Sequence, residues 1–116
     1  MTDITIYHNP RCSKSRQTLA LIEERGVTPT IIEYLQTPPD AATLGAILDM
    51  LGIGPRDLMR NKEDPYCENN LDEEALTREN LIDAMIDNPV LIERPIVVSG
   101  AKAVVGRPPE NVLELL

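Results

Sequence analysis

Residues 4–26 read ITIYHNPRCSKSRQTLALIEERG, and this stretch predicts a strand that leads into a helix. Its first four residues alternate with the period of two that is typical of a half-buried strand. From Ser13 the apolar residues follow a helical spacing, and Arg25 followed by Gly26 is a typical helix end. Cys12 therefore lies where the strand gives way to the first turn of the helix. Free backbone N–H groups and the helix dipole favour a thiolate over a thiol at that position.

The order of the remaining elements predicts the fold class. A second strand at 30–34 completes a βαβ unit, whose two strands pair in parallel. A helical block follows at about 40–88, and the chain closes with a β-hairpin and a terminal helix. The expected elements of these two parts are helices at 40–51, 55–60 and 77–87, a polar loop at 61–70, strands at 95–98 and 103–105, and a helix from Pro108.

This order is typical of an α/β protein with a thioredoxin-like fold. Its mixed four-stranded sheet is built from the βαβ unit and the ββα unit, with the helical block inserted between the two halves. We expect residues 1–116 to form one domain of this kind. In that fold a reactive cysteine lies at the end of the first strand, which is where Cys12 lies in this sequence.

The composition argues against several classes of partner. A net charge of −8 disfavours nucleic acids and anionic membranes. The two cysteines, Cys12 and Cys67, lie far apart and do not form the pattern of a disulfide scaffold, so we expect both to be reduced. The opening has no basic segment followed by an apolar run, and no stretch approaches the roughly 18 apolar residues of a membrane span. We therefore expect a soluble cytoplasmic protein.

The motif C-x-x-S, from Cys12 to Ser15, indicates how the cysteine would work. The Ser15 hydroxyl could donate a hydrogen bond to the sulfur and so stabilise the thiolate. Because no second thiol is adjacent, an oxidised adduct at Cys12 needs an external thiol such as glutathione. A phosphatase-type C-x5-R loop is excluded, since the sixth residue after the cysteine is Thr18. The alternative, a small buried hydrophobic residue, is disfavoured by the nearby cations Arg11, Lys14 and Arg16.

Two further residues are candidates with open alternatives. His8 is the only histidine, and it could partner the thiolate as an imidazolium or shuttle a proton; it could equally be an exposed loop residue. Cys67 is expected to be incidental, although it could resolve an adduct if its loop reached Cys12. His8, Cys12 and Cys67 do not have the spacing of a zinc site, so we expect no bound metal.

Three arginines form a candidate oxyanion site. Arg94 and Arg107 each precede a proline and flank the predicted hairpin, while Arg60 ends the short helix at 55–60 of the inserted block. Guanidinium groups that converge on a thiolate would bind a tetrahedral oxyanion through two-point hydrogen bonds. The alternative is that all three are surface arginines on an acidic protein. In a thioredoxin-like fold, Arg94-Pro95 occupies the position of the cis-proline beside the reactive cysteine.

Short motifs spread along essentially the whole chain carry a family resemblance. They are HNPxCxxSR from residue 8, YLxTPP from residue 34, RxxxxPY from residue 60, NPxLIxRPIVV from residue 88 and RPxxxVLE from residue 107. Together they resemble the glutaredoxin-dependent arsenate reductases of the ArsC family.

The resemblance implies an activity, a site and partners. It implies reduction of arsenate to arsenite through a covalent Cys12–arsenate intermediate, with glutathione as the thiol co-substrate, glutaredoxin as the protein partner and no bound cofactor. The implied residues are the nucleophile Cys12, its tuning residues His8 and Ser15, and the oxyanion ligands Arg60, Arg94 and Arg107.

The residues around the nucleophile differ from those of the plasmid-type enzymes. Arg11, Ser13 and Lys14 stand where those enzymes have small neutral residues, and they resemble a chromosomal subgroup of the family. Two alternative functions stay open. One is a glutathione-dependent thiol reductase that acts on another oxidised substrate. The other is a transcriptional regulator bound to RNA polymerase, although that branch has C-x-x-C where this chain has Ser15.

Overall fold

The computed structural model describes residues 3–116, and their contacts divide the chain into two compact units. One unit is formed by the chain up to Thr37 together with Arg94–Leu116, and the other by Pro38–Glu93. The first holds the whole sheet and the second is helical. The single-domain organisation of residues 1–116 stays a prediction.

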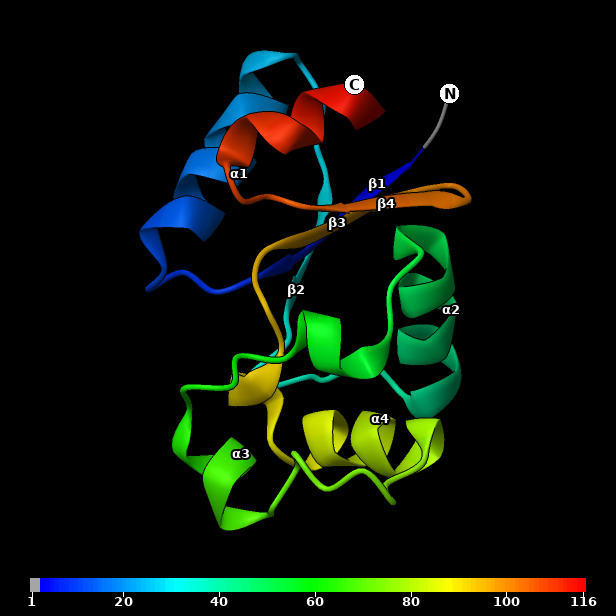
Figure 1. Ribbon diagram of the computed structural model, residues 1–116. Coiled ribbons are helices and arrows are strands. Elements are labelled where there is room, and N and C mark those ends of the chain that lie inside the picture. Colours follow the sequence, from blue (N-terminus) through cyan, green and yellow to red (C-terminus); the bar gives the residue numbers. More distant parts are fainter. Residues whose placement is uncertain (1–2) are drawn as a thin grey trace. The chain divides into compact units, whose positions relative to one another are not determined.

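The first unit is built on the predicted mixed four-stranded sheet (Figure 1). The strand order is β2-β1-β3-β4, with β1 parallel to β2 and antiparallel to β3, and β3 antiparallel to β4. This topology confirms the thioredoxin-like fold class. The strands are β1 (Ile4–His8), β2 (Thr30–Glu33), β3 (Ile96–Ser99) and β4 (Lys102–Val105).

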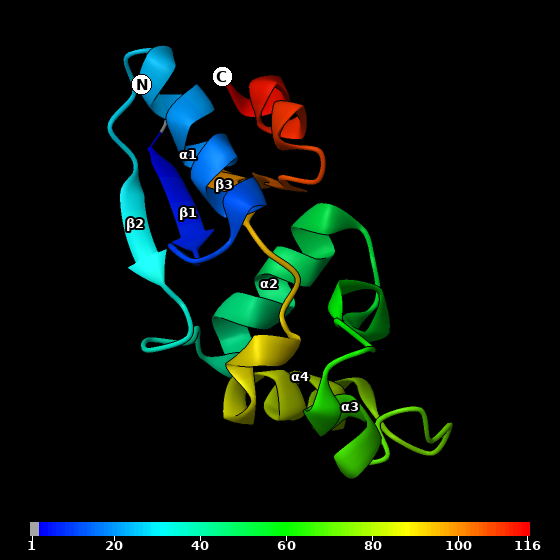
Figure 2. The same cartoon turned by 90° about the vertical axis from the view of Figure 1, so that its left-hand side faces the viewer.

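Two helical segments pack on this sheet, α1 (Ser13–Glu24) and the 3₁₀ helix η3 (Pro109–Leu115). Figure 2 shows α1 running alongside β1, the strand from which it continues. The predicted terminal helix is thus a 3₁₀ helix, a form common in short segments. Aliphatic side chains from strands and helices form the core beneath them, namely Ile4, Ile6, Ile22, Val97 and Val112.

The second unit consists of short helices with defined starts. Asp40 accepts the Thr43 N–H at 2.8 Å and begins α2 (Ala41–Leu51), while Thr77 and Asn80 cap each other at the start of α4 (Arg78–Asp87). Helices α2 and α4 pack against each other. The remaining elements of this unit are η1 (Pro55–Leu58), α3 (Asp64–Glu68) and η2 (Pro89–Leu91).

The predicted loop at 61–70 is wrong in one respect, because it contains α3. Pro65 stands in the first turn, where its missing N–H costs nothing, and Asp64 places a carboxylate at the positive end of the helix. The polar composition of the segment concealed these start signals. No helix within residues 3–116 is long and apolar enough to cross a membrane.

Candidate active site

Cys12 is held at the start of α1 by the loop that follows β1. Its N–H donates to the Asn9 carbonyl at 3.0 Å, and its own carbonyl accepts the Arg16 N–H at 3.0 Å. The Asn9 side chain tightens this loop, because its Oδ1 accepts the Arg11 N–H at 3.0 Å. Cys12 is thereby the N-cap residue of α1, as predicted, and it is only 8% exposed.

A guanidinium group lies against the Cys12 sulfur. Arg107 Nη2 donates to Sγ at 3.5 Å, and Arg107 Nε donates to the Arg94 carbonyl at 2.7 Å. The Arg94 guanidinium also hydrogen-bonds to the sulfur. The structure therefore brings both predicted hairpin arginines to the cysteine. Each of them precedes a cis peptide bond, to Pro95 and Pro108 respectively.

The pKa of the Cys12 thiol is set by its burial and by the hydrogen-bond donors and charge around it. Burial raises the pKa of Cys12, but hydrogen bonds from the Ser15 backbone N–H, the Arg94 guanidinium and the Lys14 backbone N–H, together with the Arg94 charge, outweigh it. The net pKa of Cys12 is lowered, so that the thiolate forms more readily than in free cysteine. A thiolate that accepts hydrogen bonds from two guanidinium groups is a candidate nucleophile beside a candidate anion site.

Ser15 supports the site differently from the expected hydroxyl–sulfur bond. Its side chain is fully buried, and its Oγ accepts the Asn9 N–H at 3.0 Å and lies 2.6 Å from His8 Nδ1. Its backbone N–H is the group that reaches Cys12. The hydroxyl therefore ties α1 to the end of β1 and to the loop that follows it, while the helix N-terminus itself stabilises the thiolate.

His8 is a buried residue, 6% exposed, so the exposed-loop alternative is wrong. Burial lowers the pKa of His8, the negative charge of Glu33 raises it, and the positive charge of Arg16 lowers it further. The net effect is a pKa lowered from the ordinary value of 6.5. The imidazole is therefore neutral at pH 7, and its Nδ1 shares a hydrogen bond of 2.6 Å with the Ser15 hydroxyl, whose direction is set by the ring tautomer. A neutral ring fits the proton shuttle better than the imidazolium partner.

Arg60 lies in the helical unit, and its hydrogen bond and ion pairs are with residues of that unit. Its N–H donates to the Leu91 carbonyl at 2.7 Å, and its guanidinium pairs with Glu93 at 3.3 Å and with Glu63 at 3.8 Å. Cys67 is an exposed residue on α3 of the same unit. The roles of Arg60 at the oxyanion and of Cys67 stay predictions.

Sequence reasoning did not identify Gly106, which allows α1 to approach the segment before Arg107. A Cβ at Gly106 would lie 2.5 Å from Thr18 Oγ1 and 2.8 Å from Pro95 Cγ, closer than carbon atoms pack. The Gly106 N–H also donates to the Pro95 carbonyl at 2.8 Å. The only sequence signal was a glycine directly before a candidate arginine.

The sequence model of the ArsC family matches residues 7–115. The chain belongs to the ArsC family. It is 59% identical to YfgD of Escherichia coli K12, over 97% of this chain and 96% of that protein. An arsenate reductase of Neisseria meningitidis serogroup B is 49% identical over the full length of both chains. The solved structure of an arsenate reductase from Vibrio cholerae is 49% identical and superposes with a TM-score of 0.95, covering 99% of this chain and 98% of that one.

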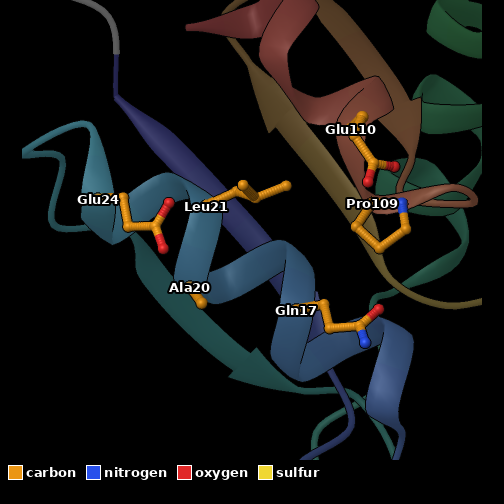
Figure 3. A pocket seen from close by; sticks show the side chains of 6 residues that line it. All are labelled: Gln17, Ala20, Leu21, Glu24, Pro109 and Glu110. Atoms are coloured by element: carbon orange, nitrogen blue, oxygen red, sulfur yellow. The ribbon is translucent and has the colours of Figure 1, made fainter.

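In this ArsC-family chain, a groove along α1 is separate from the cysteine site. It has a volume of about 330 Å³, and α1 and the start of η3 form its two sides (Figure 3). Glu24 and Glu110 lie on these sides, and two carboxylates would repel an oxyanion. This groove is therefore poorly suited to an oxyanion, and the arginine pair at Cys12 remains the candidate anion site. Within residues 3–116, no group of three or more His, Cys, Asp or Glu side chains could hold a metal ion.

Proposed function

We propose that this protein is an arsenate reductase in which Cys12 is the nucleophile and Arg94 and Arg107 bind the oxyanion. The observation that carries the proposal is the Arg107 guanidinium, fixed on the Arg94 carbonyl with its Nη2 3.5 Å from the Cys12 sulfur. The identity of 49% with arsenate reductases over the full chain supports the choice of arsenate among tetrahedral oxyanions.

The first step forms a sulfur–arsenic bond. The Cys12 thiolate attacks As(V) of dihydrogen arsenate, and a hydroxide leaves and takes up a proton to become water. The arginines stabilise the negative charge on the arsenate oxygens as the bond forms, because they are already oriented toward the sulfur. The product is an enzyme–S–arsenate adduct in which arsenic is still As(V).

The second step reduces arsenic. A glutathione thiolate attacks the Cys12 sulfur, the sulfur–arsenic bond breaks, and its electron pair leaves with arsenic as As(III). Two thiols have then been oxidised to one mixed disulfide, which balances the two electrons gained by arsenic. A glutaredoxin thiol exchanges with this disulfide and restores the Cys12 thiolate. The electrons come from thiols, so the scheme needs no bound metal or organic cofactor.

Glutathione and a glutaredoxin fit the C-x-x-S motif as partners. Ser15 cannot form a disulfide with Cys12, so an external thiol must resolve the adduct. Cys12 and Cys67 are both free thiols, which supports a reducing compartment such as the cytoplasm. Cys67 has no part in this scheme. A Cys67→Ser variant should therefore keep full activity, and it leaves Cys12 as the only thiol for labelling experiments.

The test is arsenite production by the purified protein with glutathione, glutaredoxin and arsenate. Wild type and Cys67→Ser should turn over, Cys12→Ser should be inactive with an unchanged fold, and omission of glutathione should stop multiple turnover. If no arsenite forms while Cys12 remains reduced and open to alkylation, the substrate assignment is wrong. Reduction of a different oxidised substrate under the same conditions would then favour a glutathione-linked thiol reductase.

A further inference from the structure

One side-chain amide fixes the backbone on both sides of Gly106. Asn111, in η3, donates from Nδ2 to the Val105 carbonyl at 3.2 Å and to the Arg107 carbonyl at 3.1 Å. The Arg107 N–H donates to the same Val105 carbonyl at 2.9 Å. The two amide hydrogens thus match two carbonyl oxygens, and a carboxylate at this position would repel both.

Asn111 is itself held in place by the turn that it organises. Its backbone N–H donates to the Pro108 carbonyl at 3.0 Å, and η3 packs on both α1 and β4. The residue does not cap η3, because the N-cap of that helix is Pro108. Its amide is therefore directed at the backbone that carries Arg107.

The position of the Arg107 backbone determines where its charge lies. An arginine side chain has many rotamers, and its guanidinium stays at one atom only if its Cα and its head group are both fixed. The Arg94 carbonyl fixes the head group through Nε at 2.7 Å. The Nη2–Sγ distance of 3.5 Å leaves little room, so a backbone shift of about 1 Å would break the contact with Cys12.

We propose that Asn111 is a positioning residue, whose amide holds the Arg107 backbone so that the guanidinium remains at the Cys12 sulfur. The proposal concerns the thiolate and its arginine, so it does not depend on arsenate being the substrate. It predicts that loss of the Asn111 amide weakens the stabilisation of the Cys12 thiolate, by a smaller amount than loss of the Arg107 guanidinium does. The effect of Asn111 should be exerted through Arg107.

The test is a double-mutant cycle in the Cys67→Ser background. The rate of Cys12 alkylation by iodoacetamide is measured against pH for the parent, Asn111→Ala, Arg107→Ala and the double variant. Below the parental midpoint we expect alkylation to slow by about tenfold in Arg107→Ala and about threefold in Asn111→Ala. The double variant should match Arg107→Ala, because an absent guanidinium needs no positioning.

A matched control separates positioning from general stability. Asn69 makes a comparable bond, from Nδ2 to the Pro65 carbonyl at 2.8 Å, in the helical unit. Asn69→Ala should lose similar stability without moving the alkylation midpoint. Asn111→Asp retains the size of the side chain, and it should slow alkylation at least as much as Asn111→Ala does; this variant also serves if the alanine variant does not fold.

Three results would overturn the proposal. The first is additive slowing of Cys12 alkylation in the double variant, which would mean that Asn111 acts on the sulfur independently of Arg107. The second is a lower melting temperature in both Asn111 variants with an unchanged alkylation profile. The third is an unchanged profile in Arg107→Ala, which would mean that this guanidinium does not act on the thiolate.

Discussion

Replacing Gly106 by alanine should disturb both the stability of the sheet unit and the ionisation of Cys12. The new Cβ would lie 2.5 Å from Thr18 Oγ1 and 2.8 Å from Pro95 Cγ, so one of these groups must move by about 1 Å to reach normal contact. Neither moves freely. Thr18 is fully buried and its hydroxyl donates to the Lys14 carbonyl at 2.8 Å, while Pro95 is a rigid ring.

Overpacking of this kind costs about 1–3 kcal/mol, and the lower entropy of an unfolded alanine returns about 0.4–1 kcal/mol. We expect a net loss of about 1–2 kcal/mol, which lowers the melting temperature of a chain of this size by roughly 4–8 °C. Because Gly106 directly precedes Arg107, the same shift should move the guanidinium from the sulfur and raise the pH midpoint of Cys12 alkylation.

Gly45→Ala in α2 is the matched control. The nearest atom to its new Cβ would be Ile82 Cδ1 at 3.8 Å, an ordinary contact, and alanine is favoured over glycine inside a helix by about 0.5–1 kcal/mol. This variant should melt at a slightly higher temperature with an unchanged alkylation profile. Equal behaviour of the two variants in calorimetry and alkylation would refute the close approach at Gly106.

Three further predictions concern the site residues. Arg94→Ala and Arg107→Ala should each lower kcat/KM for arsenate by about ten- to hundredfold with little change in melting temperature, because each removes a charge-assisted hydrogen bond worth roughly 1.5–3 kcal/mol. Arg25→Ala, at the other end of α1, should match wild type in the same assay, and a similar loss there would indicate a general field effect. Ser15→Ala leaves the buried His8 ring and the part-buried Asn9 N–H without their partner, so urea unfolding should show a loss of about 1–3 kcal/mol; an unchanged midpoint would contradict this hydrogen-bond network. Because the pKa of His8 is lowered from 6.5 in the folded chain, the unfolded chain binds an additional proton below about pH 6.5. The free energy of unfolding should therefore fall as the pH drops from 7.5 to 5.5. In His8→Gln this fall should be shallower, and an identical fall would contradict a neutral buried ring.

The elements that carry the site were predictable because their signals are local. Alternation in β1, the periodicity of α1 and the place of Cys12 between them can be read within one stretch of sequence. The prolines after Arg94 and Arg107 likewise marked the ends of the hairpin. Such signals lie within a few residues of one another, so a single sequence contains them.

The hydrogen bonds between distant segments could not be predicted in the same way. Arg56 and Arg78 have the spacing of polar helix faces, yet Arg56 Nε donates to the Leu71 carbonyl at 3.0 Å and Arg78 pairs with Asp49 at 2.9 Å. The Asn111 amide is a further case, since nothing in residues 105–111 indicates that two carbonyls face it. These partners are set by packing, which periodicity does not describe.

The most direct test of the thiolate–oxyanion site is the pH dependence of Cys12 alkylation in Cys67→Ser, measured with and without arsenate. A thiolate held by the helix N-terminus and by Arg94 and Arg107 should alkylate with a midpoint below that of free cysteine, about 8.5. Arsenate in the anion site should slow this reaction, and Arg107→Ala should lose that protection. A midpoint near that of free cysteine, with no effect of arsenate, would contradict both the activated thiolate and the oxyanion site.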